Sequence, residues 1–188
     1  MRKAIRYKSI ECRFIGNFKV GDNLDYNTNI LCELFRQNKT DLLNKPITLQ
    51  AGAIIEACLQ QIIFRAQNFN REGVPNISEE DRQEIEGKKI EKFAVILSVM
   101  KKYKILDRMG DDIYDELDKL RKIRNKIHIQ DFLESPKYPR DEDKLFTALL
   151  RDLAISLLTR ILLGLNEDFP RPENLKSFAT KLKIPLVG

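Results

Sequence analysis

The chain has 188 residues, a length that is most economically one domain with a terminal extension and that can bury a real core. Its 43% hydrophobic and 32% charged residues exclude a disordered chain, and its apolar runs are too short to span a bilayer. The net charge of +5 and the pI near 9.0 permit a nucleic-acid partner without requiring one.

The cysteines and the N-terminus indicate an intracellular protein. Cys12, Cys32 and Cys58 are widely spaced and include no CxxC pair, which is typical of reduced structural thiols. The first residues, MRKAIRYK, are basic but lead into no apolar segment, so no signal peptide is expected. We therefore expect a cytoplasmic protein without a membrane partner.

Residues 1–45 are predicted to form a less regular N-terminal extension. Apolar and polar side chains alternate weakly over residues 9–20, around Gly16 and Asn17, and this pattern favours a short β-hairpin. Asn27 is a candidate N-cap for a short helix that carries Ile30, Leu31, Leu34 and Phe35 on one side.

The strongest helical pattern lies over residues 47–69, where apolar residues recur at helical spacing without a proline. We predict a long buried helix here. Its lone acid, Glu56, is explained equally well by a solvated position or by a special role. Ser78 and Asp81 then resemble a capping box that opens a charged helix, which is expected to break at Gly87.

Three further segments complete the predicted bundle. An apolar stripe over residues 90–100 predicts a helix, and after a turn at DRMGDD another helix is expected to carry the sequence DELDKLRKIRNKIHIQ. A final amphipathic helix is expected over residues 141–165. Its predicted buried side consists of Leu145, Leu149, Leu153, Leu157 and Ile161. The fold class is therefore all-α, a bundle of four to five helices over residues 46–165, followed by a mostly irregular C-terminal tail, 166–188.

One face of the helix near residue 120 carries the candidate site. Arg121, Arg124 and His128, the only histidine, fall in a narrow wedge beside the apolar stripe, with Asn125 at its edge. Ion pairs one turn away, with Asp115 or Asp118, explain the arginines without any function, and helical geometry alone favours that interpretation.

The sequence LDKLRKIRNKIHI resembles the signature helix of HEPN domains, small helical bundles with an arginine, usually a polar residue, then four to six residues and a histidine. Arg124 and Asn125 form the expected pair, but only three residues separate Arg124 from His128. Arg121 has the expected six intervening residues, but Lys122 follows it. The segment AGAIIEACLQQIIF is also similar to the first core helix of that family, and the resemblance covers roughly residues 47–165.

The resemblance implies a metal-independent endoribonuclease in which two motif helices meet across a homodimer. A neutral imidazole can remove the proton of a ribose 2′-OH or protonate the leaving 5′-oxygen, while arginine holds the phosphate. The expected catalytic residues are thus Arg121, Arg124, Asn125 and His128, with RNA as substrate and without a metal or other cofactor. A role as a toxin or in phage defence, with an antitoxin or another protein as partner, is compatible with this resemblance.

Two other functions remain open. The imperfect motif spacing suits a non-catalytic module that binds a nucleotide or a protein, and a helical oligomerisation domain without a ligand is the third alternative. No HExxH, carboxylate cluster or GxxxxGK[ST] sequence favours a metallohydrolase or a nucleotide hydrolase.

Overall fold

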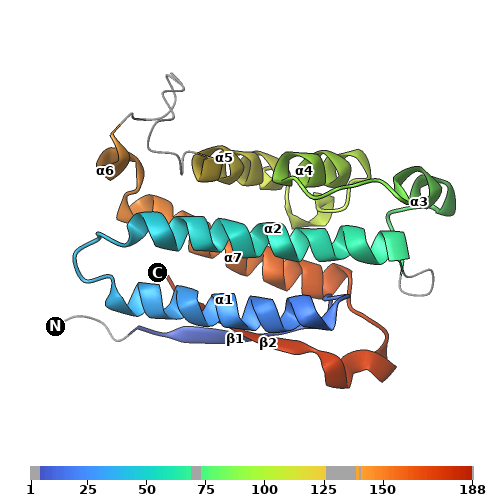
Figure 1. Cartoon of the computed structure of the whole chain (residues 1–188), viewed down its shortest axis with the longest axis horizontal. Helices are drawn as coiled ribbons and strands as arrows, with labels where there is room; N and C mark the ends of the chain where they lie inside the picture. Colours follow the sequence, from blue (N-terminus) through green and yellow to red (C-terminus); the bar gives the residue numbers. More distant parts are fainter. Residues whose placement is uncertain (1–4, 69–72, 126–138, 140, 188) are drawn as a thin grey trace.

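The computed structural model describes residues 5–68, 73–125, 139 and 141–187, apart from the side chains of residues 176–178 (Figure 1). The predicted fold class is confirmed, because the protein is a helical bundle with one small sheet. Figure 1 shows three layers, with α4 and α5 above, α2 and α7 in the middle, and α1 with the two strands below.

Helix α1 (Phe18–Gln37) is longer than the sequence suggested and starts earlier than the predicted cap at Asn27. Its N-cap is Asn17, whose side-chain oxygen accepts hydrogen bonds from the backbone N–H of Lys19 at 3.0 Å and of Val20 at 3.4 Å. Residue 18 therefore begins a helix, and the predicted turn of a hairpin at Gly16 and Asn17 is instead the entry to α1.

The expected N-terminal strand is present as β1 (Tyr7–Cys12), but its partner comes from the other end of the chain. It pairs antiparallel with β2 (Thr180–Pro185), with Tyr7 opposite Pro185 and Cys12 opposite Thr180. The C-terminal tail, predicted to be mostly irregular, thus contains this strand and a short 3₁₀ helix, η3 (Glu173–Phe178). Pairing between the chain ends buries Ile10, Leu182 and Ile184 against the bundle.

Helix α2 (Asn44–Asn68) confirms the predicted long buried helix. By length and composition alone it could cross a membrane, but 61% of its most apolar stretch is buried inside the protein, as expected for a core helix. It packs against α1, α4, α5 and α7, so its apolar side chains are covered on several sides.

The upper layer is built from short helices whose ends follow the sequence signals. Ser78 caps α3 (Glu79–Ile85), and the chain leaves this helix through Gly87, whose φ is +73°. Helix α4 (Phe93–Lys102) is followed by the 3₁₀ helix η2 (Asp107–Met109) and then by α5 (Ile113–Asn125). The apolar stripe predicted over residues 90–100 is buried.

The predicted last helix is two helices, α6 (Glu142–Leu145) and α7 (Ala148–Asp168). Thr147 separates them and caps α7, since its hydroxyl accepts a hydrogen bond from the N–H of Leu150 at 3.3 Å. The predicted buried stripe is partly wrong: Leu149 and Leu153 are 70% and 54% exposed. Nothing among the described elements covers this side of α7, so an apolar helical period there does not lead to burial.

The three predicted segments share one hydrophobic core. Buried side chains from residues 1–45, such as Phe14 and Leu31, join those of the bundle and of the tail, such as Ile184, in a single cluster. The described residues of the N-terminal extension and the tail are thus packed parts of the bundle.

Candidate functional site at helix α5

Helix α5 turns its apolar side inward as the sequence predicted. Ile113, Leu117, Leu120 and Ile123 are buried in the bundle, while Ile127, the next residue of the predicted stripe, lies outside the described residues. The two motif arginines lie at the border of this apolar side and are half-buried. The sequence therefore placed both arginines correctly with respect to the core.

Arg124 is held by an acid from another helix. Its Nη1 donates a hydrogen bond to Oε2 of Glu56, on α2, and the two side chains are only 32% and 18% exposed. One turn earlier on α2, Gly52 lies beside the stem of this arginine, where a Cβ would be in ordinary van der Waals contact, 3.4 Å from Cδ of Arg124. The acid on α2 thus fixes the guanidinium at the end of α5.

Arg121 is oriented within its own helix. Its Nε and Nη2 donate to Oδ1 of Asp118 at 2.9 and 2.7 Å, and Lys122 contacts the other oxygen at 2.6 Å. Partial burial alone would raise the pKa of Asp118, but the hydrogen bonds from Lys122 and Arg121 hold it below its ordinary value. The carboxylate is therefore ionised near neutral pH, and the ion pair predicted as the structural alternative is present.

Of the other two predicted site residues, the structure describes Asn125 but not His128. Asn125 is the last residue of α5 and is exposed. His128 follows it by three residues and lies outside the described residues. The structure thus describes three of the four predicted site residues and brings Arg121 and Arg124 to neighbouring turns of one helix.

Sequence reasoning left the role of Glu56 open between a solvated position and a special role. The residue stands out as the one acid in a long apolar segment, but its partner lies 68 positions away in the chain. A lone acid in a buried helix indicates that a cation is needed nearby, without showing which one. Only the packing of α5 on α2 identifies Arg124.

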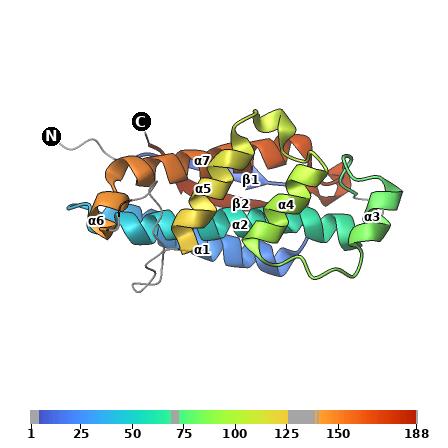
Figure 2. The same cartoon turned by 90° about the horizontal axis from the view of Figure 1, so that it is seen from above.

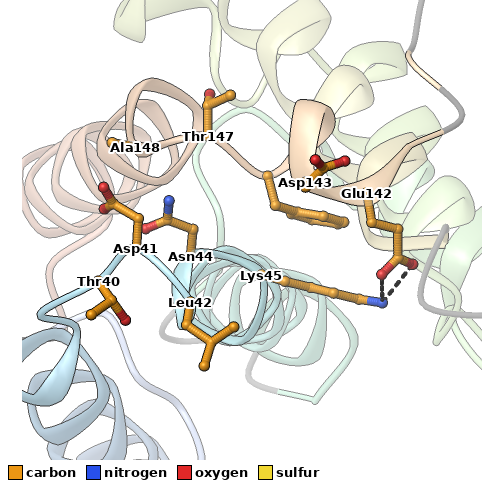
Figure 3. A pocket seen from close by; sticks show the side chains of 10 residues that line it. Thr40, Asp41, Leu42, Asn44, Lys45, Glu142, Asp143, Thr147 and Ala148 are labelled. Carbon is orange, nitrogen blue, oxygen red and sulfur yellow. Dashed lines mark hydrogen bonds and ion pairs between the residues drawn. The ribbon is translucent and has the colours of Figure 1, made fainter.

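A hollow of about 610 Å³ lies away from this site, where the loop between α1 and α2 meets α6 and the start of α7 (Figure 3). Lys45 reaches across it to Glu142, with Nζ–Oε distances of 2.6 and 2.7 Å. At its other side Asp41 accepts a hydrogen bond from Arg151 at 3.0 Å. Lys45, Glu142 and Asp41 are thus already engaged in ion pairs, and none of the site residues predicted from the sequence lines the hollow.

The described part of the chain offers little support for a metal site or for a reactive thiol. No group of three or more histidine, cysteine or acidic residues there could hold a metal ion. The three cysteines are free and buried. Burial raises the pKa of Cys12 to about 12 and of Cys32 to about 11, and that of Cys58 well above its ordinary value, so these thiols stay protonated near neutral pH.

No family model, characterised protein or solved structure matches this chain. The interpretation of the site therefore depends on the residues themselves and on the motif resemblance.

Proposed function

We propose that the protein is a metal-independent endoribonuclease whose site is formed by Arg121, Arg124, Asn125 and His128. The observation that carries this proposal is the ion pair between Arg124 and Glu56, which holds a motif arginine in one orientation at the edge of the core. An arginine fixed before substrate binds stabilises developing charge without reorganisation, which is the main source of electrostatic catalysis.

The proposed reaction is an internal transfer at phosphorus. The ribose 2′-oxygen attacks the phosphate while the bond to the 5′-oxygen breaks, giving a 2′,3′-cyclic phosphate and a 5′-OH. One group removes the 2′ proton and another protonates the 5′-oxygen, so no water is consumed. His128 serves as acid or base, and Arg124 binds the non-bridging oxygens of the phosphate.

The single histidine makes a homodimer part of this proposal. Acid and base roles need two groups, and each chain has one imidazole. Two motif helices from two copies supply both. The alternative within the same mechanism is a second, non-histidine group that takes one of the two roles.

Toward the described residues Arg124 uses only Nη1, which donates to Glu56, whereas a guanidinium has five N–H donors. The proposal assigns the remaining donors of Arg124 to the phosphate. Glu56 therefore acts in the proposal as a positioning residue. Arg121, which places two donors on Asp118, is the less available arginine.

The test is cleavage of a labelled single-stranded RNA by the purified protein in the presence of EDTA. His128→Ala should abolish cleavage, and Arg124→Ala should slow it by roughly ten- to a thousandfold, the scale for loss of one preorganised contact. Glu56→Gln should slow it less, and Arg124→Lys should not restore it, because lysine lacks the planar fork. Arg121→Ala should cost less than Arg124→Ala.

Arg108→Ala is the matched control, since Arg108 is an exposed arginine in η2, paired with Asp168. Its cleavage rate should stay at the wild-type value. Cleavage that survives His128→Ala, or that disappears with EDTA, would contradict the mechanism.

A non-catalytic binding module is the second candidate, and a specific observation favours it. Each motif arginine is paired with a carboxylate, so the formal charges of Arg121, Arg124, Asp118 and Glu56 cancel. A nuclease that must draw in a long RNA gains from net positive charge, whereas a small nucleotide can be held by individual hydrogen bonds. If the wild-type protein binds a labelled nucleotide in an anisotropy titration but never cleaves RNA, and Arg124→Ala weakens this binding, the binding module is the better conclusion.

A further inference from the structure

A dense group of lysines lies beside the candidate site. Residues 87–104, which comprise α4 and the segments on either side of it, contain six lysines and one acid, Glu91. Their surplus of five positive charges equals the net charge of the whole chain. The motif arginines are paired with Glu56 and Asp118, so α4 and its flanks supply the unbalanced positive charge next to them.

All six lysines of this group are exposed, but they differ in their partners. Three of them are paired with acids at 2.5 to 3.6 Å, namely Lys88, Lys89 and Lys102. The other three have no ion pair among the described residues, namely Lys92, Lys101 and Lys104. These three ammonium groups can bind an anion without first giving up an ion pair.

Helices α4 and α5 run antiparallel, so the start of α4 lies beside the end of α5. The hydroxyl of Tyr114, in the first turn of α5, lies 3.1 Å from the carbonyl oxygen of Met100, near the end of α4. Both helices rise by about 1.5 Å per residue, so α5 reaches Arg121 where α4 reaches Phe93. Lys92 directly precedes Phe93 and therefore lies at the end of this layer that carries the motif arginines.

The side of α4 that faces α5 is polar and carries small residues. Figure 2 shows α4 between α5 and α3. Val99 and Tyr103 line a hollow toward α3, so the opposite flank of α4, with Ala94, Ser98 and Lys101, is turned to α5. These last three residues are exposed, and none of them has a large apolar side chain.

The kind of partner follows from this composition. A protein interface needs large apolar or aromatic anchors at its centre and contains few lysines, so this flank suits an acidic protein poorly. A flat anionic membrane would also meet the adjoining residues 79–86, which carry five acids and one arginine. A narrow chain of phosphates can follow α4 away from those acids, and lysines bind phosphates without an apolar contact.

We propose that the side of α4 next to α5 is the surface that binds the RNA backbone. Lys92 contacts phosphates beside the motif arginines, and Lys101 contacts the strand about 14 Å further along α4. This inference rests on the proposed function and adds a binding surface to its site. Because the motif arginines carry little net charge together with their acid partners, these lysines supply the attraction that draws in a long RNA.

The test is binding of a fluorescein-labelled single-stranded 2′-O-methyl RNA, measured by anisotropy over a series of KCl concentrations. This RNA has no 2′-OH and cannot be cleaved by the proposed reaction, so binding is separate from catalysis. For the wild type, the logarithm of the binding constant should fall linearly with the logarithm of the KCl concentration. Lys92→Gln and Lys101→Gln should each weaken binding and reduce this slope by about 0.7, the value for one phosphate contact on a single strand.

Lys181→Gln is the matched control, because Lys181 is an exposed lysine of β2, in the layer opposite to α4 (Figure 1). It removes the same charge and should leave both the affinity and the slope close to the wild-type values. An equal loss in this variant would overturn the proposal, because the attraction would then depend on net charge alone. A wild-type slope in the variant that combines Lys92→Gln with Lys101→Gln would overturn it as well.

Co-sedimentation with vesicles of phosphatidylserine and phosphatidylcholine tests the alternative partner. The protein should stay in the supernatant at about 0.15 M salt, where exposed charges are screened beyond about 8 Å. Binding to these vesicles that the combined variant loses, in a protein that does not bind the RNA, would overturn RNA as the partner.

The two proposals fail in different ways. RNA binding that depends on Lys92 and Lys101, in a protein that never cleaves ordinary RNA, would support this surface and contradict the ribonuclease. Cleavage of ordinary RNA that keeps its wild-type salt dependence in the combined variant would support the ribonuclease and overturn this surface.

Discussion

Helices α2 and α7 are both long and apolar and pack against each other, yet they differ in how much of their surface is covered. Helix α2 is surrounded by α1, α4, α5 and α7, and its isoleucines and Leu59 are buried. Helix α7 packs mainly on α2 and the strands, and its outer side, with Leu149 and Leu153, faces solvent.

The difference teaches that apolar spacing and burial are separate properties. Spacing determines which side chains share a side of a helix, whereas the neighbours of the helix determine whether that side is covered. At α2 the two agree. At the start of α7 they do not, because no described element packs on the side that carries Leu149 and Leu153.

The largest effect is expected from a truncation in α2. Ile55 is fully buried, so Ile55→Ala removes apolar contacts and leaves a cavity that the packed helices around it cannot close. The free energy of unfolding should fall by about 2–5 kcal/mol in urea denaturation followed by circular dichroism. Ile55→Val, which removes less, should cost about 0.5–1.5 kcal/mol. A loss below that of the valine variant would contradict the described burial of α2.

An intermediate effect is expected at the corner that ties α7 to α5. Gly110 has φ of 110° and ψ of 156°, a conformation that residues with a side chain rarely adopt. A Cβ at this position would also lie 2.6 Å from Nη2 of Arg160. Arg160, on α7, donates from Nη1 to Glu116 at 2.7 Å and from Nε to the carbonyl of Met109 at 2.9 Å. Gly110→Ala should therefore destabilise the protein by about 1–3 kcal/mol.

Gly87→Ala serves as the comparison, because this glycine also has positive φ but a Cβ there meets nothing within 4 Å. Only the backbone strain remains, so the loss should be about 1 kcal/mol. Equal losses in thermal or urea unfolding would show that Arg160 moves aside freely and does not hold the corner.

The smallest effect is expected from Leu149→Ala on the exposed side of α7. Because this side chain is mostly exposed, its truncation removes few contacts within the chain. The free energy of unfolding should therefore change by less than about 0.5 kcal/mol at protein concentrations too low for association. A large loss at every concentration would mean that Leu149 is covered within a single chain.

In the candidate site, too, contacts within one helix could be predicted from the sequence, whereas a contact between two helices could not. Helical periodicity placed Arg121 and Arg124 at the border of the core, and the ion pair of Arg121 with Asp118 follows from their spacing of three residues. The partner of Arg124 could not be found in this way, because Glu56 approaches it only through the packing of α5 on α2.

The sequence by itself determined the fold class, the long helix α2, the capping residue Ser78, the break at Gly87 and the orientation of α5. Each of these follows from spacing or capping within a few residues, where the chain geometry leaves few alternatives. The tertiary structure alone decided that β1 pairs with β2, that Asn17 begins α1, that Glu56 holds Arg124 and that two leucines of α7 stay exposed. Three of these depend on which distant segments come to lie side by side, and such contacts leave no periodic signal in the sequence. At Asn17 the cap is local, but a Gly-Asn pair among weakly alternating residues suits a hairpin equally well, and only the packing of α1 against α2 and β2 selects the helix.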